Sequence, residues 1–120
     1  QLGKYIEAHN QERLLELIGA TEPHVVRYYK QQGDSVFINS FKDYHDGNKT
    51  YFENPIYRET KSEGKLVQRK YQVAYYTNIV EIKHEYGIFA ISDDGGDNWL
   101  FVREKDYNNP KINGFKRLFH

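Results

Sequence analysis

Residues 86–104 read Tyr-Gly-Ile-Phe-Ala-Ile-Ser-Asp-Asp-Gly-Gly-Asp-Asn-Trp-Leu-Phe-Val-Arg-Glu. Two runs of aromatic and β-branched side chains, which favour strands, flank a polar centre. The centre, Asp93 to Gly96, consists of residue types that tolerate the positive φ of a tight hairpin turn. The stretch therefore predicts a β-hairpin, and Trp99, the one tryptophan of the chain, follows the turn.

The hairpin also carries a recognisable turn motif. Ser92, Asp94, Gly96 and Trp99 fit Ser-x-Asp-x-Gly-x-x-Trp and resemble the Asp-box. Asp94 can accept hydrogen bonds from turn amides, Gly96 can take a backbone conformation that is costly for other residues, and Trp99 can pack over the hairpin. In the unrelated families that share the Asp-box, including sialidases, the motif is structural and lies away from the active site. The resemblance therefore implies a structural role.

Three carboxylates in this turn, Asp93, Asp94 and Asp97, raise the alternative of a metal site. A calcium loop needs regularly spaced oxygen ligands and a distal glutamate, and this turn lacks that pattern. We therefore expect turn stabilisation, with no metal and no cofactor.

Length and charge exclude several classes of function. A chain of 120 residues predicts one domain, residues 1–120, with a core of its own. Seventeen basic and seventeen acidic side chains give no net field to attract nucleic acid. Lys65, Arg69, Lys70 and Tyr71 form only a weak basic and aromatic pattern, so we expect no nucleic-acid binding. No apolar run approaches the roughly 20 residues of a transmembrane helix.

The absence of cysteine excludes disulfides, thiolate metal sites and cysteine nucleophiles. The chain begins at Gln1 and contains no methionine, which predicts a start codon further upstream. A trimmed chain and a chain with an excised leader would look the same. We favour the leader, and so expect an exported bacterial protein that is secreted, periplasmic or lipid-anchored at the cell surface.

The first third of the chain predicts helices. Apolar residues recur at helical spacing over residues 2–18, where Asn10 is expected to cap a second short helix. Thr21 as a cap and Pro23 in the first turn predict the next helix. A third helix is expected from Asp34 to about residue 44, although residues 35–41 are also acceptable as a strand.

After a turn at residues 45–48 the pattern becomes extended. Strands are expected over 50–60 and 65–82, with turns at 61–64 and 83–85. In the tail, residues 107–110 predict a loop. Phe115, Leu118 and Phe119 predict a short helical turn that docks on the sheet.

Helices over about 2–44, strands over about 49–104 and a tail over 105–120 predict an α+β domain. We expect the N-terminal helices to pack on one face of a curved four-stranded antiparallel sheet. Residues 5–18, Tyr-Ile-Glu-Ala-His-Asn-Gln-Glu-Arg-Leu-Leu-Glu-Leu-Ile, resemble the first helix of the nuclear transport factor two-like superfamily, the cystatin-like α+β roll. Residues 90–102, with Lys-Arg-Leu-Phe at 116–119, resemble the last hairpin and tail of its small exported bacterial members.

The resemblance covers about a third of the chain and implies a fold more than an activity. Some members of that superfamily are isomerases, dehydratases or cyclases that use acids and histidines in a pocket. Many others bind a ligand or dimerise through the sheet.

Two sets of side chains are candidates for a site. Asp43, His45 and Asp46 form an acid–histidine–acid cluster suited to acid–base catalysis, and the alternative is a solvated polar turn. Tyrosines on the long strand and second helix predict an amphipathic wall for a small apolar or sugar-like ligand, and the alternative is core filling. The wall comprises Tyr28, Tyr71, Tyr75 and Tyr76, with Tyr29 and Phe41 beside them.

The sequence thus favours a non-enzymatic domain that binds a ligand or a protein partner. The alternative is a small acid–base enzyme of isomerase or dehydratase type with its site in the cone of the roll. A homodimer formed through the sheet is a further prediction.

Overall fold

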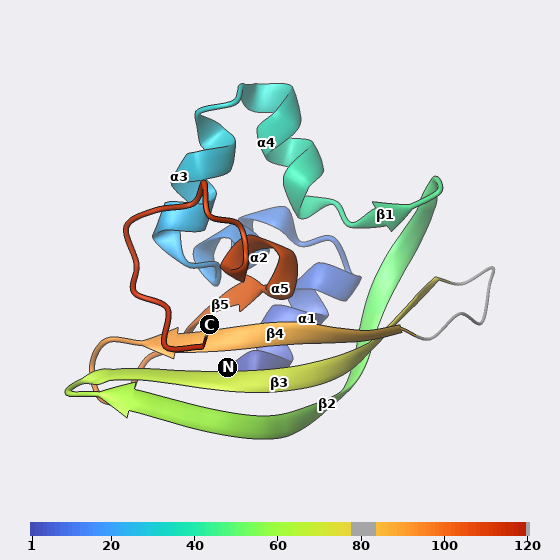
Figure 1. The fold of residues 1–120 in the computed structure, drawn as a ribbon. Coiled ribbons are helices and arrows are strands. Elements are labelled where there is room, and N and C mark those ends of the chain that lie inside the picture. The colour runs from blue at the N-terminus through green and yellow to red at the C-terminus, as the bar shows by residue number, and fades with distance from the viewer. Residues whose placement is uncertain (78–83, 120) are drawn as a thin grey trace.

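The computed structural model describes residues 1–77 and 84–119. The helices are α1 (Leu2–Asn10), α2 (Leu14–Gly19), α3 (Pro23–Lys30), α4 (Asp34–Phe41) and α5 (Glu104–Tyr107). The strands are β1 (Tyr44–His45), β2 (Asn48–Glu63), β3 (Leu66–Thr77), β4 (His84–Ser92) and β5 (Leu100–Arg103). Four helices precede an open antiparallel sheet of order β1-β2-β3-β4-β5, which confirms the predicted α+β class (Figure 1).

The predicted count of four strands is wrong. The helix expected from Asp34 to about residue 44 is α4, which ends at Phe41. The chain then forms the two-residue strand β1, which pairs with the start of β2. Asp46 and Gly47, both with positive φ, make the turn between them. A strand of two residues has no alternation to read, so the pattern at residues 44–45 could not reveal it.

The turn of the long hairpin of β2 and β3 lies later in the chain than predicted. β2 continues through Glu63, so the expected turn at 61–64 is shifted, and Gly64 supplies the positive φ of 61°. β3 is described as far as Thr77, and residues 78–82 of the predicted strand lie outside the described residues, as does Lys83. The turn expected at 83–85 is wrong for His84 and Glu85, because they begin β4.

The outer edge of β2 is irregular. Its pairing with β3 shifts register between Glu53 and Ile56 and again between Tyr57 and Glu59. Asn54 has a φ of 52° and Pro55 has no N–H to donate. Among the described strands, none pairs with this edge beyond Lys49. Bulges and a proline are features that discourage a further strand from adding to an edge.

Helices lie on both faces of the sheet, so the expectation of one covered face is wrong. Successive side chains of a strand point to opposite faces. In β5, Phe101 packs against Tyr5 of α1 with ring centroids 5.0 Å apart, whereas Val102 belongs to the same cluster as Val25 of α3. Figure 1 shows α1 behind the sheet and the C-terminal tail in front of it.

The chain changes face at the edge of β5. Thr21 forms a parallel bridge with Phe101, whose backbone also bonds Ala20 O and Glu22 N. α1, α2 and α4 therefore contribute to one core, and α5 and the tail to another. α3 contributes to both, because Val26 packs against the first core and Val25 belongs to the second. The first core contains Tyr5, Ala8, Leu17, Phe41, Phe52, Val73, Ile88, Ala90 and Phe101. The second contains Val25, Phe89, Ile91, Val102, Tyr107, Ile112 and Phe119.

Two predicted caps have other roles. Glu22, not Thr21, caps α3, because its carboxylate accepts hydrogen bonds from the backbone N–H groups of His24 and Val25. Asn10 caps no helix, since its amide group bonds both the N–H and the C=O of Phe52 on β2. A side-chain amide can imitate a strand partner in this way, and here it ties α1 to the sheet.

The tail forms no helical turn at residues 115–119, but Phe119 docks on the sheet as expected. It is buried against Phe89, with ring centroids 5.5 Å apart. Phe119 is held without a helical turn, because its N–H bonds the hydroxyl of buried Tyr107.

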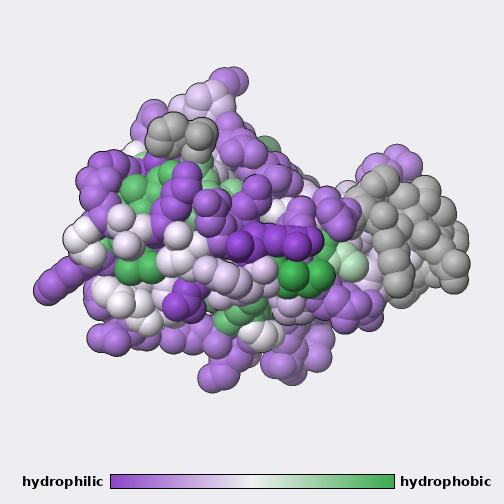
Figure 2. Space-filling model, turned by 60° about the horizontal axis from the view of Figure 1, so that its bottom comes forward, coloured by the Kyte–Doolittle hydropathy of each residue, from purple (hydrophilic) through white to green (hydrophobic). Residues whose placement is uncertain are grey.

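The surface is largely polar on the side drawn in Figure 2, where hydrophobic residues form separate small patches. Ile56 and Tyr57 on β2 are about half exposed. Isolated apolar side chains of this kind are ordinary on soluble surfaces. In the described part of the chain, no helix is long and apolar enough to span a membrane.

Candidate functional site

The loop between β4 and β5 fixes the position of Trp99. Ser92 Oγ bonds Asp94 Oδ1 at 2.7 Å, and the other bonds of the Asp94 carboxylate come from Asp97 and Asn98. The indole N–H of Trp99 donates to Gly96 O at 2.9 Å. The loop therefore uses the one polar atom of the indole and leaves the apolar surface of the ring for packing.

Asp94 holds this loop as a carboxylate. Hydrogen bonds from the Asn98 backbone, the Asn98 amide and Ser92 keep the pKa of Asp94 well below its usual range. Because the folded-state pKa is lowered, the stabilisation is present at neutral pH and is lost only in strong acid.

Replacing Asp94 with alanine is expected to loosen the loop and lower the midpoint of thermal unfolding. Since Trp99 is the only tryptophan, its emission should also move to longer wavelength as the ring gains contact with water. The neighbouring Asp93 is exposed and serves as a control of equal charge. Equal changes in Asp93→Ala and Asp94→Ala would show that the carboxylate bonds do not hold Trp99.

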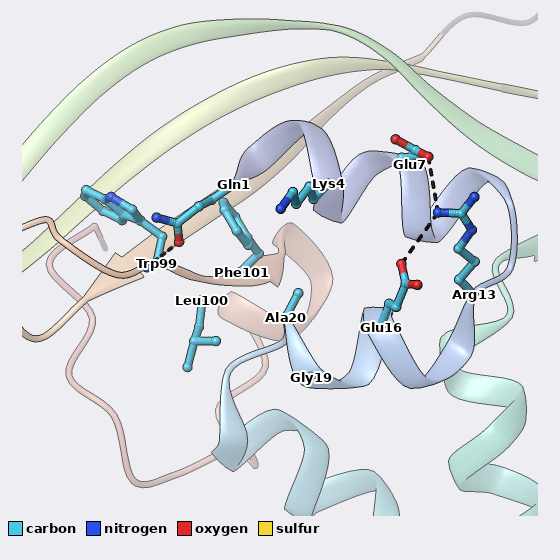
Figure 3. Close-up of a pocket in the computed structure, with 10 residues that line it drawn as sticks. All are labelled: Gln1, Lys4, Glu7, Arg13, Glu16, Gly19, Ala20, Trp99, Leu100 and Phe101. Carbon is cyan, nitrogen blue, oxygen red and sulfur yellow. Dashed lines mark hydrogen bonds and ion pairs between the residues drawn. The ribbon is translucent and has the colours of Figure 1, made fainter.

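Beside Trp99 lies a hollow of about 630 Å³ between α1, α2 and the start of β5 (Figure 3). Trp99, Leu100 and Phe101 form one end of it, and Ala20 continues the apolar lining. This volume lies in the range of roughly 300–1,000 Å³ that small-molecule sites occupy. The complete lining is Gln1, Lys4, Glu7, Arg13, Glu16, Gly19, Ala20, Trp99, Leu100 and Phe101.

The opposite end of this hollow is charged. Arg13 lies 3.2 Å from Glu7 and 3.7 Å from Glu16, and about half of its side chain is exposed. Such exposed pairs contribute little stability, so their groups can exchange partners at low cost. Lys4 lies between the two ends in Figure 3 and makes no ion pair with any described residue. The hollow thus joins an apolar surface to hydrogen-bonding groups of both charges.

A second, smaller hollow of about 290 Å³ adjoins the first on the sheet side of α1. Arg69 lies over the Trp99 ring, 4.6 Å from its centroid, and Tyr71 lies next to it in the lining. Gln1 contributes to both hollows and joins α1 to the loop, because its amide bonds Asp97 O and Trp99 N. Trp99 therefore stands at the junction of the two hollows.

A buried pairing of ionisable groups lies elsewhere, inside the first core. His9 Nε2 is 3.3 Å from Asp43 Oδ2, and Tyr75 donates to the other Asp43 oxygen at 3.0 Å. Burial raises the pKa of Asp43, but the hydrogen bond from His9 and the nearby positive charges outweigh burial and lower the pKa to about 2. His9 Nδ1 is also occupied, by Asn10 at 2.9 Å. With both ring nitrogens bonded, His9 has no free position for a substrate.

A buried ion pair lies next to this group. Arg103 bonds Asp106 Oδ2 through Nε and Nη2, at 3.2 and 3.1 Å, and their side chains are 6 % and 2 % exposed. Asp106 Oδ1 accepts the hydroxyl of Tyr29. Burial and this bond raise the pKa of Tyr29, which keeps the phenol protonated as a donor. The pair links β5, α5 and α3.

The candidate catalytic cluster is divided in the structure. Asp43 points to His9 and Tyr75, whereas His45 and Asp46 are exposed in the β1–β2 hairpin and pair with each other at 3.4 Å. His9 and Asp43 are 34 residues apart in the sequence, so no local spacing pointed to their contact.

The candidate tyrosine wall is also divided. Tyr71 lines the smaller hollow, Tyr75 bonds Asp43, and Tyr76 lies on the other face of β3 with its hydroxyl on Glu53. Tyr28 lines a separate hollow beside α3. Tyr29 and Phe41 pack edge to face at 6.2 Å. The lining of the large hollow was missed, because it combines helix surface residues that carry no shared motif with Trp99, which was predicted only as a structural residue of the turn.

Within the described residues, no group of three or more histidine, aspartate or glutamate side chains is placed to hold a metal ion. The side chains that stand out chemically are therefore those of the hollow beside Trp99 and those of the buried pairs. Comparisons with protein-family models, curated proteins and solved structures give no match.

Proposed function

We propose that this chain is a non-enzymatic ligand-binding domain whose site is the hollow beside Trp99. The observation that carries the proposal is that one hollow has an apolar end, Trp99 with Leu100, and a charged end. The charged end includes Lys4, which forms no ion pair with a described residue, and the exchangeable pairs of Arg13. Ligand sites typically combine an apolar lining with a few polar groups that fix orientation.

The chemistry of the lining favours a small sugar-like ligand over a purely apolar one. A sugar ring has apolar C–H surfaces that can pack on an aromatic ring, and hydroxyls that can bond charged side chains. Trp99 offers ring surface because its N–H is already bonded. Lys4 offers donors, and Glu7 and Glu16 offer acceptors for hydroxyl groups.

The expected result is a saturable change in Trp99 fluorescence when the protein is titrated with neutral disaccharides such as maltose, cellobiose, lactose and chitobiose. Because Trp99 is the only tryptophan, the signal reports on this hollow and on the smaller one that shares the ring. Glu16→Ala removes a lining acceptor and should weaken binding about tenfold, the value of one hydrogen bond to a charged group. Leu15→Ala, its neighbour at 87 % exposure, should leave binding unchanged.

Octanoate provides the opposing probe. Saturable binding of octanoate without any response to the disaccharides would contradict a sugar-like ligand and favour an apolar one. No response to any of these probes, or equal weakening in Glu16→Ala and Leu15→Ala, would contradict the site.

We also infer a fold of the nuclear transport factor two-like type. The order of helices before an antiparallel sheet and the curvature of β2 in Figure 1 support this inference. The helix on the second face, α3, is the feature that fits it least. Export from a bacterial cell and a homodimer through the sheet stay predictions. The acid–base enzyme also stays a prediction, and of its candidate residues Asp43, His45 and Asp46 only Asp43 is buried.

A further inference from the structure

A third hollow, of about 210 Å³, lies between α3 and the loop that follows α5. It is separate from the site beside Trp99 and shares no residue with it. Its lining is His24, Arg27, Tyr28, Gln31, Lys111 and Asn113. All six side chains carry a hydrogen-bond donor or can carry one, and no carboxylate is among them.

One side of this hollow is a stripe along α3. His24, Arg27, Tyr28 and Gln31 follow the spacing i, i+3, i+4 and i+7, which places them on one face of a helix. Glu22, the N-cap of α3, is 5 % exposed, and its carboxylate already bonds the backbone N–H groups of residues 24 and 25 and the Nδ1 of His24 at 2.5 Å. Glu22 is therefore turned away from a ligand.

The other side of the hollow is the loop that follows α5, which is fixed by the buried side chain of Ile112 and by hydrogen bonds from Arg117. Ile112 is fully buried, and Arg117 donates to Ile112 O and to Asn109 O. Gly114, with a φ of 110°, packs so closely on His24 that a Cβ there would lie 2.1 Å from the His24 ring. Lys111 and Asn113 flank the buried Ile112 and are both exposed. The loop thus presents these two side chains to the α3 stripe as a preformed surface.

Arg27 and Lys111 supply two positive charges to this hollow, and neither forms an ion pair with a described residue. A guanidinium and an ammonium converging without a carboxylate suit a doubly negative tetrahedral group, which Arg binds through parallel N–H bonds and Lys as a point charge. We propose that this hollow binds the phosphate group of a small phosphorylated molecule. The volume accommodates a phosphate with part of the group that carries it.

The test is a titration of the ¹⁵N-labelled chain with inorganic phosphate, followed by amide chemical shifts at constant ionic strength kept with sodium chloride. Saturable shifts are expected at residues 27, 31, 111 and 113. The variant Arg27→Gln/Lys111→Gln should bind at least about tenfold more weakly, because it loses two charge-assisted contacts. Lys30→Gln/Lys65→Gln removes the same charge from exposed positions outside the hollow and should bind as the unmodified chain does.

The spectra also show whether each variant is folded, since both pairs of substitutions are on the surface. Linear, non-saturating shifts would overturn the proposal, as would saturable shifts centred on other residues. Equal weakening in the two double variants would overturn it too, because binding would then follow net charge alone. A parallel titration with sulfate should give the same pattern of shifts, since sulfate has the same shape and charge, and no sulfate response at all would contradict an electrostatic oxyanion site.

Discussion

Replacing Arg103 with methionine is expected to lower the free energy of unfolding by about 3–5 kcal/mol, the usual cost of breaking a buried ion pair. The substitution leaves the Asp106 carboxylate, 2 % exposed, with Tyr29 as its remaining side-chain partner among the described residues. Urea denaturation at pH 7 measures the change. Arg58→Met, at an exposed arginine that bonds Gln72, should change stability by no more than about 0.5 kcal/mol.

A double variant separates the loss of the ion pair from the loss of packing. Arg103→Met/Asp106→Leu removes the unpaired carboxylate together with its partner, so it should be more stable than Arg103→Met alone. The single variant Asp106→Leu gives the loss of stability for that substitution alone. If the double variant is less stable than Arg103→Met by the same amount, the two residues do not act as a pair. If Arg103→Met is no worse than Arg58→Met, the buried contact contributes nothing measurable.

Replacing Asp43 with asparagine is expected to lower the free energy of unfolding by about 2 kcal/mol at neutral pH and to change its pH dependence. The pKa of Asp43 is lowered from its ordinary value of 3.8 to about 2, so the folded state favours the carboxylate. A lowered folded-state pKa contributes stability above pH 4, and this contribution is lost as pH falls through 2. The difference follows from about 1.4 kcal/mol for each unit of pKa.

Urea denaturation at pH 7, 5, 3 and 2 tests this expectation. The gap in stability between the unmodified chain and Asp43→Asn should be full at pH 5 and 7 and should shrink between pH 4 and 2. Asp46→Asn is the control, because the Asp46 side chain is 87 % exposed. A gap that does not vary with pH would mean that Asp43 acts through shape and not through its charge.

The parts of the fold that follow local patterns were predictable from the sequence. Helices before strands, the hairpin around residues 93–99 and the docking of Phe119 each depend on a period or a turn signal within a short window. The cap of α3 was assigned one residue too early, because threonine is a preferred N-cap residue and glutamate is not. The contact with the sheet determines which residue caps the helix. Thr21 pairs with Phe101, so the helix begins after Glu22.

The candidate sites were less predictable because they combine distant segments. His9 reaches Asp43 across 34 residues, and Asn10 reaches Phe52 across 42. The passage of α3 to the second face also depends on one bridge at the edge of β5, which a linear pattern cannot reveal. Once the faces are divided in this way, tyrosines that look like one wall in the sequence belong to different surfaces.

The irregular edge of β2 bears on how this protein behaves at high concentration. Long straight strands with free backbone groups are the templates on which fibrils grow. Here Pro55 interrupts the row of donors, and two register shifts bend the strand away from the flatness that stacking requires. The protein should therefore form no fibrils at high concentration, and variants that remove Pro55 or the two register shifts should lose this protection.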